Sequence, residues 1–341
     1  MTSSQSSASR SSAWRRFLFL LAPVLALCLA SGAARANTCT ASMTDVVFDK
    51  VSPLAGSDYY ATGTLTVSCT YSALGNSGLL GLLLPNVSVC ATLGGNDYAM
   101  RTMKNGGSSL PFNLYIDSSY TVSKIWGQGS STGTSSFNAS LTGLLSLGTA
   151  TGSVTVYGRI PGNAIGNVRA GGSGTTTYTA DFAGLGVLRY AFGTLLDAGC
   201  TTGSAATFSF QARASVVNDC YITANPLTYG TTSVLAAAVR ARTTINVQCA
   251  AGSAYQVALN AGNNGADGVR RMKNVSTGEM VKYTLSSTLD GENWGNGTVG
   301  QPLTGTGSGS VQALTVYSRV DPQTTPTPGD YKDTVTATIS F

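Results

Sequence analysis

The sequence predicts an all-β protein made of two immunoglobulin-like β-sandwich domains, the second of which lacks its last strand. Three observations support this prediction. Apolar residues alternate with Thr, Ser or Asn in short runs such as 65–69 and 245–249, which is typical of half-buried antiparallel strands. The same motifs occur twice along the chain in the same order. The alternating run at 335–341 is the last segment of the sequence, so we expect the second sandwich to remain open.

The composition excludes several classes of protein. The 341 residues include 20 Lys and Arg, 15 Asp and Glu and no His, and only 10% of residues are charged. Without His, the usual imidazole base and metal ligand are missing. The 41 Gly, together with many Ser and Thr, favour short strands and turns over helices. A hydrophobic content of 43% is enough to fill a core.

Residues 1–36 have the features of a signal peptide. Three arginines precede an apolar run at 17–30, and an A-x-A cleavage site follows at 34–36, so we expect the mature chain to begin at Asn37. The apolar run is short for a transmembrane helix. All basic residues of this segment leave with it, and the nearly neutral mature chain has no basic stripe for nucleic acid. We expect an exported protein with no nucleic-acid partner.

The two halves of the chain share six motifs in the same order, about 170 residues apart, which indicates a duplicated domain. We expect an N-terminal domain at 37–212 and a C-terminal domain at 213–341. In the first copy, the run at 207–212 can supply the domain's own last strand. The matched pairs are Cys39 and Cys220, Cys69 and Cys249, Met103 and Met272, Trp126 and Trp294, Tyr157 and Tyr317, and Tyr178 and Tyr331.

The first copy carries three insertions and a long tail that the second copy lacks. The first two insertions and the tail at 182–216 are rich in Leu, whereas the third, at 161–174, is Gly-rich and is interpreted as an ordinary loop. The apolar segments are either extra core strands or surface loops that bind a partner, since an exposed apolar loop is otherwise costly. The candidate surface-binding residues are Leu79, Leu80, Leu82, Leu83, Leu84, Leu144, Leu145, Leu185, Val187 and Leu188.

Six cysteines remain after signal cleavage, and an even count in an exported chain predicts three disulfides. The repeat pairs Cys39 with Cys69 and Cys220 with Cys249. Cys90 and Cys200 have no counterparts in the second copy and form the remaining bond, which ties the tail to the first insertion.

Signals for catalysis are weak. Ser131 lies in a formal G-x-S-x-G motif, but there is no His to activate it. Asp290, Glu292 and Asn293 do not have the spacing of a calcium loop and are interpreted as a solvated turn. We expect no enzyme, no cofactor and no metal site.

Several motifs of the second copy resemble a known family. They are Cys220-Tyr221-Ile222, Leu227-Thr228-Tyr229-Gly230, the strand ending at Cys249, Val316-Tyr317-Ser318-Arg319 and the closing segment from Gly329 to Phe341. On these motifs each copy resembles the spore coat protein U domain, the pilin family of archaic chaperone–usher fimbriae. The match is specific over 217–341. The first copy matches at Cys39, Cys69, Trp126 and Tyr157 but departs in its insertions and tail.

This resemblance implies a periplasmic chaperone, an outer-membrane usher and assembly by donor-strand complementation, in which the next pilin subunit inserts a strand beside Val335, Ala337, Ile339 and Phe341. Only Asn37 and Thr38 precede Cys39, too few to donate a strand of usual length. A divergent first domain on a standard second one resembles the two-domain tip adhesins of this pilus class. We expect a cell-surface tip adhesin that supports attachment and biofilm formation on hydrophobic or host surfaces. The alternatives are a minor structural pilin or secreted coat protein and, on weaker grounds, an exported hydrolase.

Overall fold

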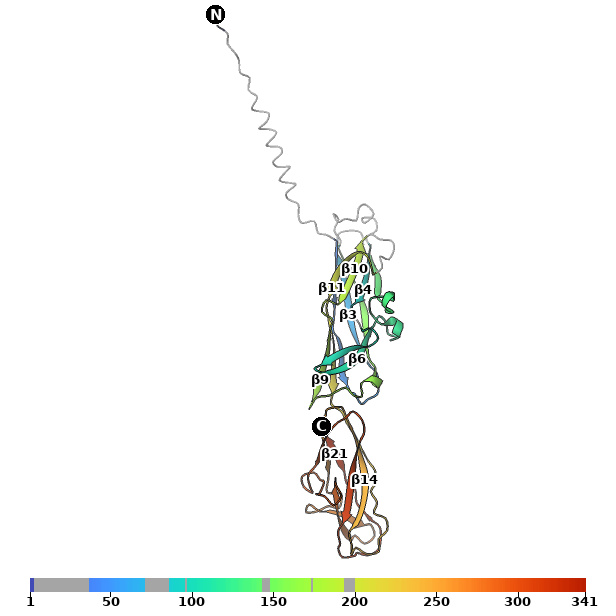
Figure 1. Cartoon of the computed structure of the whole chain (residues 1–341), viewed down its shortest axis with the longest axis vertical. Helices are drawn as coiled ribbons and strands as arrows, with labels where there is room; N and C mark the ends of the chain where they lie inside the picture. Colours follow the sequence, from blue (N-terminus) through green and yellow to red (C-terminus); the bar gives the residue numbers. More distant parts are fainter. Residues whose placement is uncertain (3–36, 71–85, 96, 143–147, 173, 193–199) are drawn as a thin grey trace.

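The computed structural model describes residues 1–2, 37–70, 86–95, 97–142, 148–172, 174–192 and 200–341. The predicted signal segment lies almost entirely outside these residues. The two domains stand end to end, the N-terminal one coloured blue to yellow and the C-terminal one orange to red (Figure 1). Both are built from strands, as predicted. No helix in the described part of the chain is long and apolar enough to cross a membrane.

The N-terminal domain is a sandwich of an eight-stranded and a four-stranded sheet. The larger sheet has the order β1-β3-β8-β6-β5-β9-β12-β2, and the smaller has the order β11-β10-β4-β7. All pairings are antiparallel except that of β12 with β2. The larger sheet contains β1 Thr38–Met43, β2 Val46–Val51, β3 Tyr59–Thr70, β5 Arg101–Asn105, β6 Ser108–Tyr115, β8 Thr149–Ile160, β9 Thr175–Asp181 and β12 Gln211–Val217. The smaller contains β4 Asn86–Leu93, β7 Phe137–Thr142, β10 Gly186–Phe192 and β11 Ser204–Phe208, and three short 3-10 turns lie at Val122–Lys124, Ser130–Thr132 and Gly162–Ala164.

The C-terminal domain repeats this plan with fewer strands. Its six-stranded sheet has the order β13-β14-β19-β17-β16-β20, and its three-stranded sheet the order β18-β15-β21. The strands are β13 Cys220–Ala224, β14 Val239–Cys249, β15 Ala254–Leu259, β16 Arg270–Asn274, β17 Met280–Ser286, β18 Leu303–Thr306, β19 Gln312–Val320, β20 Tyr331–Lys332 and β21 Ala337–Ser340.

Each sandwich is organised around a buried tryptophan near the centre of its core. Trp126 is fully buried, and its indole N–H donates to the backbone oxygen of Ala91 at 3.1 Å. Trp294 repeats this bond to Val257 at 2.8 Å. In the N-terminal domain, Phe208 stacks on Trp126 at 6.2 Å between ring centroids. The indole N–H therefore has a partner, as a buried polar group requires, while the ring supplies apolar contact area.

The last strands of the N-terminal domain extend beyond the predicted boundary. The chain does supply its own closing strand, but this segment crosses from one sheet to the other: β11 pairs with β10, and β12 then pairs with β9 and β2. Residues 213–217 therefore belong to the first sandwich, not to the second as predicted. The sequence pattern could not show this, because the alternation of inward and outward residues along β12 is compatible with a strand of either domain.

The third insertion is not an ordinary loop, since it forms the joint between the domains. Ile165, Val168 and Ala170 are buried, and the Ala170 N–H donates to the Ala251 oxygen at 3.1 Å. On the other side of the joint, the Ser52 hydroxyl donates to Asp219 at 2.6 Å. The joint is thus held by apolar burial and by hydrogen bonds from both domains.

A substitution at Gly309 is expected to loosen this joint. A Cβ at Gly309 would collide with the backbone oxygen of Gly166, and its φ of +81° is in the left-handed region. Gly297 has a φ of +93° but open space around it, so Gly297→Ala carries the backbone strain without the collision. We expect Gly309→Ala, but not Gly297→Ala, to broaden the distribution of domain orientations in small-angle X-ray scattering of the full chain. Equal scattering from both variants would contradict this role of the joint.

Candidate functional site

The outer edge of β21 is the feature that most clearly distinguishes the two domains. β21 pairs antiparallel with β15, with Ile339 opposite Val257, and no other described strand pairs with it. Its counterpart in the N-terminal domain is β10, where Leu188 lies opposite Ala91. The equivalence follows from the tryptophan bonds, because Ala91 and Val257 accept the indole N–H of their respective domains. The other edge of β10, however, is paired with β11.

The missing strand leaves apolar side chains of β21 incompletely covered. Leu188 is 0% exposed and Tyr190 9%, whereas the equivalent Ile339 is only half-buried and Phe341 is 49% exposed. Val335 and Ala337 are half-buried against the core, like Ile339. An unpaired strand edge beside partly covered apolar residues is the arrangement that an added strand completes.

The predicted surface-binding leucines fall into three groups. Leu79, Leu80, Leu82, Leu83, Leu84, Leu144 and Leu145 lie outside the described residues. Leu188 does not belong to a binding surface, because it is fully buried in the core of the N-terminal sandwich. Val187 is half-buried, and Leu185 is 39% exposed. The prediction for Leu188 is therefore wrong, since burial in this core depends on strands other than its own and could not be inferred from the local sequence.

The strand ends that flank the apolar segments lie together at one end of the N-terminal domain. Thr70 lies opposite Thr149, Asn86 opposite Thr142, and Phe192 opposite Val87. This is the end farther from the C-terminal domain (Figure 1). Leu185 precedes the other end of β10, so it is not brought together with these strand ends.

The three predicted disulfides are confirmed. Cys39 is bonded to Cys69, Cys220 to Cys249, and Cys90 to Cys200. The bond between Cys90 and Cys200 connects β4 to the chain just before β11. It therefore anchors the segment that leads into the closing strand.

A buried arginine in each domain was not recognised from the sequence. Arg101 donates to the Asn113 side-chain oxygen at 2.6 Å and to the Trp126 backbone oxygen at 2.7 Å, and burial lowers its pKa to about 10. Arg270 donates to the Trp294 oxygen at 2.9 Å, and burial lowers its pKa too. Arg270, rather than the adjacent Arg271, is the structural counterpart of Arg101, because each donates to the backbone oxygen of its domain's tryptophan. The signal was the repeated placement of each arginine two residues before the matched methionine, Met103 or Met272.

The weak catalytic candidates acquire no catalytic geometry. Asp290 forms ion pairs with Arg240 and Arg319 at 2.8 and 3.3 Å, and the hydrogen bond from Arg240 chiefly lowers its pKa. Ser131 lies in the 3-10 turn at Ser130–Thr132. Among the described residues, no group of three His, Cys, Asp or Glu is placed to hold a metal ion.

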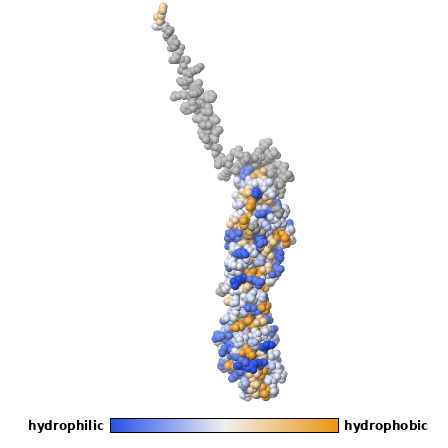
Figure 2. Space-filling view, viewed as in Figure 1, coloured by the Kyte–Doolittle hydropathy of each residue, from blue (hydrophilic) through white to orange (hydrophobic). Residues whose placement is uncertain are grey.

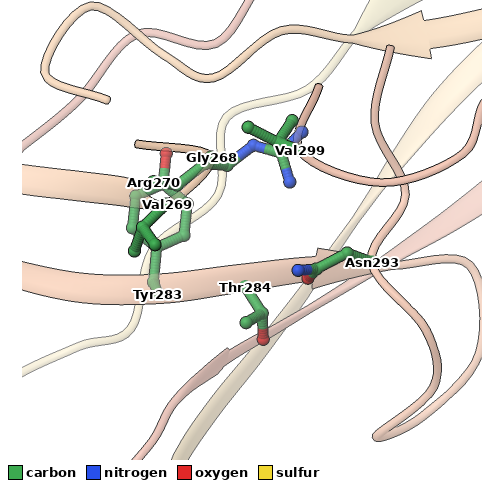
Figure 3. A pocket seen from close by; sticks show the side chains of 7 residues that line it. All are labelled: Gly268, Val269, Arg270, Tyr283, Thr284, Asn293 and Val299. Carbon is green, nitrogen blue, oxygen red and sulfur yellow. The ribbon is translucent and has the colours of Figure 1, made fainter. Parts of the chain in front are cut away.

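A small pocket in the C-terminal domain does not suggest a ligand site. Its volume of about 100 Å³ is below that of typical small-molecule sites. The pocket is lined by the residues drawn in Figure 3, which are Gly268, Val269, Arg270, Tyr283, Thr284, Asn293 and Val299.

On the face drawn in Figure 2, the described surface shows small apolar patches among polar residues.

Comparison with known proteins identifies one family. The family model described as Spore Coat Protein U domain matches residues 25–179 and 206–338. No curated protein matches the chain. Among solved structures, the chain is similar to the CsuC–CsuE chaperone–tip adhesion subunit pre-assembly complex of archaic chaperone–usher Csu pili from Acinetobacter baumannii, with 15% identity, a TM-score of 0.49 and coverage of 89% of this chain and 100% of the other. A secreted serine protease, VesC of Vibrio cholerae, has 9% identity, a TM-score of 0.15 and coverage of 86% and 48%. Neither structural likeness is close enough to support a functional argument.

Proposed function

The chain belongs to the Spore Coat Protein U domain family, and from this premise we propose that it is the tip adhesin subunit of an archaic chaperone–usher pilus. The observation that carries the proposal is the contrast between its two domains. The N-terminal sandwich is closed by its own strand β11, whereas no described strand pairs with the equivalent edge of the C-terminal sandwich. A subunit of this kind accepts one strand through its second domain and leaves its first domain free for another task.

The open edge of β21 is where assembly partners bind in this proposal. A periplasmic chaperone first covers the edge, and the next pilin subunit then replaces it at the outer-membrane usher. Main-chain hydrogen bonds along β21 supply affinity, and the partly covered side chains of Val335, Ala337 and Ile339 supply pockets for alternate residues. The subunit then reaches the cell surface at the pilus tip.

The far end of the N-terminal domain is the adhesive surface in this proposal. The strand ends flanking the leucine-rich segments 79–84 and 144–145 lie together there. Burial of one Leu side chain contributes roughly 1.5–3 kcal/mol, so a few contacts offset the cost of immobilisation. Many pili on one cell multiply a weak single-tip affinity, which supports attachment and biofilm formation on hydrophobic surfaces.

Leucine substitutions test the adhesive surface. We expect the triple variant Leu80→Ser, Leu83→Ser and Leu145→Ser to assemble pili, because the C-terminal domain is unchanged. Cells carrying it should be retained on polystyrene at least about tenfold less than wild-type cells, since each leucine contributes more than the roughly 1.4 kcal/mol that corresponds to a factor of ten. Retention is counted after washing, and pili are counted by electron microscopy.

The matched control replaces three exposed apolar residues of the C-terminal domain, Val234, Val275 and Leu289, by Ser. This variant should attach normally. Assembled leucine-variant pili that attach as well as wild type would contradict the adhesive role and favour a structural pilin or coat protein. Loss of assembly would show that these leucines are part of the core.

A further inference from the structure

Four tyrosines gather on the outer face of the larger sheet of the N-terminal domain. Tyr60, Tyr115 and Tyr157 lie on the neighbouring strands β3, β6 and β8, and Tyr120 lies in the loop after β6. The Tyr120 ring is 4.7 Å from that of Tyr60, 5.4 Å from that of Tyr115 and 6.2 Å from that of Tyr157, measured between centroids. We call these four residues the tyrosine platform. Its most exposed member, Tyr60, is 55% accessible to solvent.

The duplicated domain shows that the fold does not require a tyrosine at the position of Tyr60, the most exposed ring of the platform. Tyr60 lies opposite Arg159 in the pairing of β3 with β8, and Arg240 lies opposite Arg319 in the equivalent pairing of β14 with β19. The position of Tyr60 is thus occupied by Arg240 in the second domain. The same surface therefore carries an arginine in one domain and an exposed tyrosine in the other.

The loop residue Tyr120 has a similar counterpart in Asp290. Both follow the equivalent strands β6 and β17, and their φ angles are 52° and 53°. Asp290 accepts two hydrogen bonds from Arg240, at 2.8 and 2.9 Å. A solvated ion pair in the second domain is thus replaced in the first by two aromatic rings in contact, with an interplanar angle of 47°. Since Tyr120 and Asp290 have the same left-handed φ, this backbone conformation does not explain why the first domain carries aromatic side chains here.

A rigid charged pair lies beside the tyrosine platform. Arg159 donates to one oxygen of Asp58 at 2.8 and 2.7 Å, and the Tyr60 hydroxyl donates to the same oxygen at 3.3 Å. The other Asp58 oxygen accepts the Gly162 N–H at 2.9 Å, which is the largest cause of its lowered pKa. The side chains of Arg159 and Asp58 remain 33% and 27% exposed. Polar groups held in place in this way lose little entropy when they bind a ligand.

We propose that the tyrosine platform, with Asp58 and Arg159, is a binding site for a neutral glycan. A pyranose ring has an apolar C–H face and a rim of hydroxyls, which match the exposed aromatic side chain of Tyr60 bordered by fixed hydrogen-bonding groups. The charges of Asp58 and Arg159 cancel, which favours a neutral sugar over an anionic one. This site is separate from the leucine-rich end and does not depend on the tip assignment.

Binding of the full chain to a printed array of neutral mono- and oligosaccharides tests the proposal, with saturation-transfer NMR on the sugars that bind. Tyr60→Ala is expected to weaken binding at least about tenfold, because it removes the most exposed ring. The double variant Tyr60→Arg, Tyr120→Asp introduces the residue pair of the C-terminal domain and is expected to abolish binding. Arg240→Ala, at the matched position of the C-terminal domain, should bind like wild type.

Circular dichroism shows whether each variant is folded, and Tyr60→Ala alone decides the question if the double variant does not fold. A full chain that binds no neutral sugar on the array would overturn the proposal, as would binding that Tyr60→Ala leaves unchanged. If Tyr60→Ala instead abolishes self-association or capture of another protein, the site is a protein interface and the glycan proposal is wrong.

Discussion

A strand appended after Phe341 is expected to convert the full chain from an aggregation-prone protein into a stable monomer. In the N-terminal domain, β11 runs antiparallel to β10, with Ala206 opposite Leu188 and Phe208 opposite Gly186. A copy of residues 204–208 joined to Phe341 by a short glycine-rich linker can fold back in the same direction along β21. It would satisfy the unpaired backbone groups of that edge and cover Ile339.

The register also predicts which sequence should fit the edge best. Gly186 makes room for the ring of Phe208, since a Cβ there would collide with it. The equivalent position in β21 is Ala337, whose Cβ occupies that space. We therefore expect an appended strand with Val at the Phe208 position to stabilise the chain more than the unchanged copy. A strand with Asp at the Ala206 and Phe208 positions is the control and should leave the chain aggregation-prone.

Size-exclusion chromatography with light scattering and thermal unfolding measure these outcomes. The Val-containing strand should give a monomer with the highest midpoint of unfolding, and the Asp-containing strand should behave like the unmodified chain. A stable, monomeric unmodified chain would show that the edge of β21 needs no partner strand, and it would remove the main support for strand-mediated assembly.

Replacement of Arg101 by Met is expected to destabilise the N-terminal domain by about 1–3 kcal/mol. The side chain is only 6% exposed and satisfies both the Asn113 side-chain oxygen and the Trp126 backbone oxygen. Methionine fills a similar volume but removes the donor to the Trp126 oxygen, whereas the Asn113 oxygen still accepts the Leu114 N–H at 3.1 Å. One buried unsatisfied group costs about 1–3 kcal/mol. Urea unfolding of the full chain, followed by tryptophan fluorescence, measures the change in the first domain's transition.

Arg213→Met is the matched control for this prediction. Arg213 pairs with Asp45 at 2.7 Å on the surface of the same domain, and its side chain is 45% exposed. Because exposed pairs contribute about 0–1 kcal/mol, this variant should unfold close to wild type. Equal stability of Arg101→Met and Arg213→Met would show that the buried hydrogen bonds around Trp126 are not the source of stability that we infer.

Local sequence patterns were sufficient to predict most of the framework. Alternating residues such as Leu65, Val67 and Cys69 predicted a strand correctly, because side chains in a strand point to opposite faces with a period of two. The repeated cysteine spacing predicted the disulfides, and the run at 207–212 predicted that the first domain closes itself. Each of these features depends on residues close in sequence or on comparison of the two copies.

The sequence alone thus determined the duplication, the strands, the disulfide pairs and the difference between a closed and an open domain. The tertiary structure decided that Leu188 is buried, that 161–174 forms the joint, that Arg270 rather than Arg271 is the counterpart of Arg101, and that the tyrosine platform exists. The reason is physical. Alternation shows which side chains share a face of a strand, but what surrounds that face depends on strands from elsewhere in the chain, such as those that form the core around Leu188 or β8 beside Tyr60.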